Sequence, residues 1–149
     1  MIVTLGGTVL ETDRAENRRL YAGWETVTEG CGCDGCRNFL LAVPSLPEPV
    51  RDFFDGLGVD LRKAAEVIPW NGEDGGKRMH YGGFYHLGGR LCAGGLEKAG
   101  FVPLAEGYCV AFTEEISLPE ADCPARVLQL EIDFSGVPWL LEGRNPYCE

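Results

Sequence analysis

The sequence lacks long hydrophobic runs and has few basic residues. No stretch approaches the roughly 18 consecutive apolar residues of a membrane-spanning helix, and residues 1–8 have neither the basic nor the apolar region of a secretory signal. Lys and Arg number 13 against 23 Asp and Glu, so the formal charge is −10. Binding to DNA, RNA or an anionic membrane needs a basic surface. We therefore expect a cytoplasmic protein that binds neither nucleic acid nor membrane.

Residues that carry common catalytic chemistry are also scarce. Serine occurs only at positions 45, 117 and 135, and none lies in a Gly-x-Ser-x-Gly motif, which argues against a serine hydrolase. No phosphate-binding loop of the Gly-x₄-Gly-Lys-Ser/Thr type is present. The two histidines are His80 and His86, which would lie far apart on one extended strand. The sequence gives no reason to expect an enzyme of these classes.

What is present is typical of a globular protein. The chain has 149 residues, of which 45% are apolar and 10% aromatic. This length and composition predict one domain, residues 1–149, with its own hydrophobic core. Glycine, at 21 residues, is about twice as common as usual, which favours many tight turns.

Alternation of apolar and polar residues predicts a largely antiparallel sheet. In Arg126–Phe134, residues 128, 130, 132 and 134 are apolar, while residues 129, 131 and 133 are polar. A Gly6-Gly7 pair predicts a hairpin between two short runs near the N-terminus. The predicted strands are Ile2–Leu5, Thr8–Thr12, Glu25–Glu29, Glu66–Trp70, Met79–Leu91 (one kinked strand or a hairpin), Tyr108–Thr113 and Arg126–Phe134. Val137–Leu141 is expected as a last edge strand, because Pro138 disfavours a central place in the sheet.

Two helices are predicted between these strands. Asp34 can cap a helix over Gly35–Val43. A second helix follows a capping box at Ser45–Glu48, with Val50, Phe53, Phe54 and Leu57 on one face. The sequence therefore predicts an α+β fold, in which an antiparallel-rich β-sheet carries a short helical insertion packed on one face.

Cysteine is the most informative residue type. The chain has seven, an odd number that disfavours a complete set of disulfides. Cys92, Cys109, Cys123 and Cys148 stand alone, and we expect them to be small buried hydrophobic residues.

The other three, Cys31, Cys33 and Cys36, form a compact Cys-x-Cys-x-x-Cys motif with glycine at positions 30, 32 and 35. One turn can direct such cysteines at a single metal ion, and thiolate ligands favour zinc. A closed zinc site needs about four ligands. The fourth would come from Cys92, Cys109, Cys123, Cys148, His80 or His86. The motif predicts a zinc knuckle, with plain turn cysteines as the alternative.

Other functions remain open. Cys33 and Cys36 could form a redox dithiol, because a helix N-terminus lowers the pKa of a thiol. Against this, no parallel βαβ unit surrounds the motif, and Asp34 disfavours a thiolate.

Gly30, Gly32 and Gly35 also match a dinucleotide-binding pattern, but no second parallel strand with an acidic end follows. The charge of −10 also suits an inhibitor or immunity-type protein with a basic partner.

Several segments together resemble small uncharacterised bacterial proteins. They are Cys31–Phe39 with its CxCxxC-RNF pattern, the FFxxLGVD pattern of Phe53–Asp60, Tyr81–His86 (YGGFYH) and Pro138-Trp139. The resemblance implies a self-contained domain and brings no activity with it. The sequence thus predicts a small acidic binding or accessory domain rather than an enzyme, with an unknown protein or small molecule as its partner.

Overall fold

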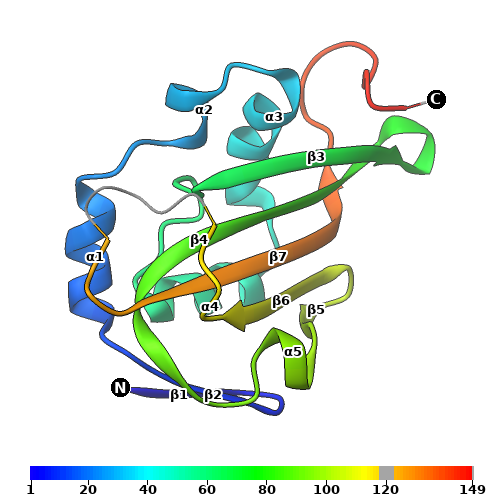
Figure 1. Ribbon diagram of the computed structural model, residues 1–149. Coiled ribbons are helices and arrows are strands. Elements are labelled where there is room, and N and C mark those ends of the chain that lie inside the picture. Colours follow the sequence, from blue (N-terminus) through cyan, green and yellow to red (C-terminus); the bar gives the residue numbers. More distant parts are fainter. Residues whose placement is uncertain (118–122, 149) are drawn as a thin grey trace.

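The computed structural model describes residues 1–117 and 123–148. In this part of the chain seven strands form an antiparallel sheet with the order β1-β2-β4-β7-β6-β5, and β3 also pairs with β4 (Figure 1). The predicted α+β class is confirmed. The strands are β1 (Ile2–Leu5), β2 (Thr8–Thr12), β3 (Glu66–Glu73), β4 (Arg78–Ala93), β5 (Val102–Ala105), β6 (Tyr108–Thr113) and β7 (Val127–Pro138). The prediction of a separate edge strand over Val137–Leu141 is wrong, because β7 continues through Pro138 in its pairing with β4.

Strand β4 organises the sheet. It is one continuous strand of 16 residues, so the Met79–Leu91 segment is a kinked strand rather than a hairpin. One of its edges pairs with β7, and the other pairs first with β3 and then with β2. The change of partner comes before Gly89, whose φ of +147° and close approach to the Glu11 carbonyl oxygen require glycine.

The helices between β2 and β3 cover one face of this sheet. Figure 1 shows α3 and α4 behind it, with α2 near one end of β3. The inserted helices are α1 (Arg14–Ala22), α2 (Val27–Gly30), α3 (Asp34–Ala42) and α4 (Glu48–Leu57), and α5 (Leu96–Ala99) precedes β5. None of the helices in the described ranges is both long and apolar enough to cross a membrane.

The core lies between these helices and the sheet. The alternating apolar residues of β7, from Leu128 to Phe134, are at most 2% exposed, as predicted. Val50, Phe54 and Leu57 of α4 are also buried. Phe53 is only half-buried, so the prediction that it belongs to the buried stripe is wrong. Its ring lies at the border of the core, 6.3 Å from that of Phe112.

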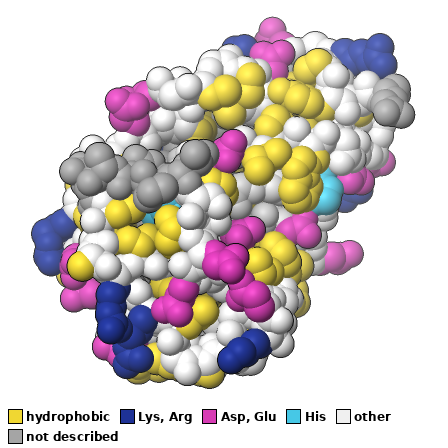
Figure 2. All heavy atoms as spheres, viewed as in Figure 1, with side chains coloured by type: hydrophobic (Ala, Val, Ile, Leu, Met, Phe, Trp, Pro, Cys, Tyr) yellow, Lys and Arg dark blue, Asp and Glu magenta, His cyan; other side chains and the backbone are white. Residues whose placement is uncertain are grey.

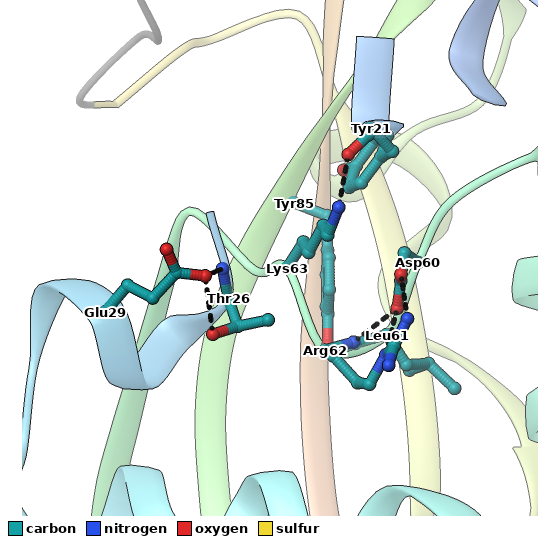
Figure 3. Close-up of polar contacts among 8 residues, drawn as sticks. All are labelled: Tyr21, Thr26, Glu29, Asp60, Leu61, Arg62, Lys63 and Tyr85. Carbon is teal, nitrogen blue, oxygen red and sulfur yellow. Dashed lines mark hydrogen bonds and ion pairs between the residues drawn. The ribbon is translucent and has the colours of Figure 1, made fainter. Parts of the chain in front are cut away.

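Two local predictions fail because short-range hydrogen bonds decide the backbone. Glu25–Glu29 is not a strand: the Glu29 carboxylate accepts hydrogen bonds from the Thr26 amide at 2.8 Å and the Thr26 hydroxyl at 3.0 Å (Figure 3). These bonds start α2 at Val27. Ser45 does not cap α4, because it ends a 3₁₀ turn and the helix begins after Pro47.

Candidate metal centre

The structure brings together the three cysteines that the sequence singled out. The sulfur atoms of Cys31, Cys33 and Cys36 all lie within 4.8 Å of one another. Cys31 ends α2 and is exposed, Cys33 precedes α3 and is half-buried, and Cys36 is buried in the first turn of α3. Such a group could hold a metal ion.

The cap of α3 is a cysteine rather than the predicted Asp34. Cys33 has an extended backbone, and its sulfur accepts a hydrogen bond from the Cys36 amide at 3.4 Å. Asp34 lies inside the helix and pairs with Arg37 at 3.0 Å on the surface. The first turn of α3 therefore directs a backbone N–H group at the Cys33 sulfur, where it stabilises negative charge.

Close packing against β3 explains one glycine of the motif. A Cβ atom on Gly35 would lie 2.6 Å from the Pro69 side chain and 3.0 Å from the Tyr147 hydroxyl. At Gly30 and Gly32 a Cβ atom would meet nothing within 4 Å. Only Gly35 is thus sterically required, and it lets the start of α3 approach β3.

Two tyrosines hold the same turn in place. The Tyr147 hydroxyl accepts a hydrogen bond from the Gly35 amide at 3.1 Å and contacts the Cys33 thiol. The Tyr81 hydroxyl donates to the Gly35 carbonyl at 2.7 Å and accepts from the buried Asn38 amide at 3.1 Å. Sequence analysis missed Tyr147, since nothing in its local pattern links it to a motif at the other end of the chain.

The environments of Cys33 and Cys36 shift the pKa values of these two thiols in opposite directions. Burial raises the pKa of Cys33, but hydrogen bonds from the Cys36 amide and from the Cys31, Cys36 and Tyr147 side chains outweigh it, so this pKa lies below its ordinary value. Burial raises the pKa of Cys36 strongly, and the neighbouring thiols of Cys33 and Cys31 raise it further. The half-buried Cys33 thiol is therefore more acidic than the buried Cys36 thiol.

The expected fourth ligand is not found in the described ranges, where no other His, Cys, Asp or Glu joins the group. The His80 Nε2 atom lies 2.5 Å from Asp133, and the buried His86 Nε2 lies 3.1 Å from Gln129. The four lone cysteines also lie outside the group, and the prediction that they are buried is wrong: Cys92 is exposed, while Cys109, Cys123 and Cys148 are half-buried.

A cleft of about 450 Å³ opens beside the thiols. Cys31 and Cys36 form part of its wall. Its other walls come from the segment around Trp24 and Val27 and from the start of β3 around Val67. The cluster is therefore reachable from a concave surface as well as from the open side at Cys31.

Comparison with known proteins finds no relative: no family model, no curated protein and no solved structure matches the chain at a significant level. Function must therefore follow from the chemistry of the three thiols and of the surfaces around them.

Proposed function

We propose that this protein is a binding domain whose Cys31, Cys33 and Cys36 hold one thiophilic metal ion, zinc under cellular conditions. The observation that supports this is the approach of three sulfurs within 4.8 Å of one another from one short segment. Thiolates are soft ligands that select zinc among the common divalent ions, and three of them can share a tetrahedral ion. A redox pair would use only two of the three thiols as reacting groups.

Three protein ligands leave one coordination position for a water molecule or another donor. That arrangement resembles open zinc sites rather than closed structural ones. The Gly35 and Cys36 region is held to β3 and to the C-terminal segment by packing and hydrogen bonds, so the site is organised by the fold itself. We infer a role in binding rather than in stabilising the fold alone.

Metal content tests the proposal directly. Protein purified without chelator should contain close to one equivalent of zinc by native mass spectrometry, and Cys31→Ser, Cys33→Ser or Cys36→Ser should each lower it. Cys92→Ser is the matched control, since Cys92 is exposed and outside the cluster. Zinc far below one equivalent in reduced wild-type protein, even after zinc is added, would refute the proposal.

A thiol redox function is the second candidate, and the unlike environments of Cys33 and Cys36 support it. The Cys33 thiolate would attack one sulfur of a substrate disulfide and release the other as a thiol. Cys36 would then attack the Cys33 sulfur of the mixed disulfide. The substrate gains two electrons and two protons, and a Cys33–Cys36 disulfide forms. In this case Cys31→Ser would leave disulfide reduction intact, whereas it would weaken a metal site.

A basic protein partner is the third candidate. Figure 2 shows acidic side chains gathered over the sheet face that the helices leave open. Glu66, Phe84 and Glu131 lie in register across β3, β4 and β7, and Trp70 nearby is 50% exposed. Salt-sensitive binding to basic proteins should weaken in Glu131→Gln/Asp133→Asn, but not in the control Glu16→Gln/Glu48→Gln. Equal binding by both variants would remove this candidate.

A further inference from the structure

The cleft beside the cysteine cluster has the features of a ligand site. Its volume of about 450 Å³ suits a small molecule. Val27, Val67 and Ala64 give it apolar walls, and each is at most 8% exposed. A metal ion held by the three thiols would stand at its wall, because Cys31 and Cys36 belong to both the cleft and the cluster.

Charge limits which ligands fit. Glu25 and Glu66 line the cleft, whereas none of the described residues that line it is Lys, Arg or His. Neither carboxylate has a hydrogen bond or ion pair within the described parts of the chain. The nearby polar groups are already engaged: Glu29 bonds to Thr26, and Lys63 donates to the Tyr21 carbonyl at 2.7 Å (Figure 3). Zinc with three thiolates adds a net negative charge, so the cleft disfavours anions.

We propose that the cleft binds a small thiol that also carries an ammonium group. Its sulfur would take the open fourth position on the metal ion, which completes a four-sulfur tetrahedron. Its ammonium group would lie near the carboxylates of Glu25 and Glu66. This inference rests on the proposed metal site, and it explains why a cleft lined by two carboxylates adjoins a cluster that lacks a fourth protein ligand in the described ranges.

The test uses the full chain loaded with Co²⁺, whose visible absorption reports the number of sulfur ligands. Cysteamine, a cationic thiol, should change the spectrum at a concentration about five- to tenfold lower than mercaptoacetate, an anionic thiol. Glu25→Gln/Glu66→Gln should bring the two concentrations close together. Glu16→Gln/Glu48→Gln, which removes the same charge from exposed positions outside the cleft, should leave the ratio unchanged.

A second variant tests the cleft itself. Ala65 lines it and is half-buried, so Ala65→Phe should block the response to cysteamine while Co²⁺ still binds. If Co²⁺ gives no tetrahedral thiolate spectrum, the proposed metal site is wrong. If Co²⁺ binds but cysteamine leaves the spectrum unchanged, strips the ion, or acts no better than mercaptoacetate, the metal site stands and the cleft proposal is overturned.

Discussion

The Tyr147 hydroxyl accepts a hydrogen bond from the Gly35 amide at 3.1 Å, although the two residues lie 112 positions apart in the chain. The Tyr147 side chain also lowers the pKa of the nearby Cys33 thiol. The Tyr147 carbonyl accepts a hydrogen bond from the Gly72 amide at 3.0 Å. The C-terminal segment is thereby tied to both α3 and β3. This segment is therefore part of the cysteine site, and its Tyr147 side chain stabilises negative charge on Cys33.

Tyr147→Phe should therefore raise the pKa of Cys33, because the thiolate loses a hydrogen-bond donor. Alkylation by iodoacetamide, followed by mass spectrometry at each cysteine, should be roughly two- to fivefold slower at Cys33 at pH 7. Exposed Cys92 in the same sample is the internal control. An unchanged pH profile at Cys33 would show that the hydroxyl does not act on the thiol.

Gly35→Ala should destabilise the protein by about 1–3 kcal/mol, since the new Cβ overpacks the contact between α3 and Pro69. It should also weaken metal binding, because the turn that carries Cys33 and Cys36 must move. Gly32→Ala is the matched control, as its Cβ would meet nothing within 4 Å. Urea denaturation and zinc titration measure both effects; equal behaviour of the two variants would contradict this packing argument.

Periodicity predicted those parts of the fold in which burial alone decides the structure. The alternation in β7 and the spacing of Val50, Phe54 and Leu57 report directly which side chains face the core. Periodicity failed at Glu25–Glu29, where a single buried residue, Val27, is outweighed by hydrogen bonds between Thr26 and Glu29.

The motif likewise predicted the cysteines but not their surroundings. Sequence spacing is enough to bring Cys31, Cys33 and Cys36 together, because they share one turn. It says nothing about Tyr147, whose position depends on how the C-terminal segment returns to β3. Sequence spacing also does not show that Gly35 is sterically required while Gly30 and Gly32 are not. That difference arises because only Gly35 packs against Pro69.

Asn38→Ala should lower the free energy of unfolding by about 2–3 kcal/mol, because it leaves buried polar groups without partners. Asn38 is fully buried, and its side chain bonds to the Tyr81 hydroxyl, the Pro138 carbonyl and the Leu140 amide. Exposed Asn71, with weak bonds of 3.3 Å, is the control position. If Asn71→Ala destabilises the protein as much in urea, the buried network is not the cause.

Phe54→Ala should destabilise the protein by about 3–5 kcal/mol, as expected for a buried aromatic residue. Phe54 is 1% exposed and packs on Tyr85 with ring centroids 5.1 Å apart. Phe53→Ala should cost less, about 1–2 kcal/mol, because its ring is only half-buried. Chemical denaturation of both variants decides the ranking, and the reverse order would mean that α4 packs through its other side.

Zinc affinity should rise with pH, because zinc competes with protons for the thiols. The raised pKa of Cys36 keeps that thiol protonated near neutral pH in the metal-free protein, so binding must release its proton. The lowered pKa of Cys33 means that its proton is released more readily and contributes to the slope at lower pH. Each proton released makes the affinity about tenfold weaker per pH unit of acidification.

Competition with a coloured chelator between about pH 6 and pH 8 should therefore give a log affinity that rises by roughly one to three per pH unit. Cys92→Ser should reproduce this slope, since it removes a thiol from outside the cluster. Calorimetry in buffers of different ionisation enthalpy counts the released protons independently. An affinity that does not change with pH, or binding that releases no proton, would mean that the ion is not held by Cys36, and three-thiolate coordination would then be untenable.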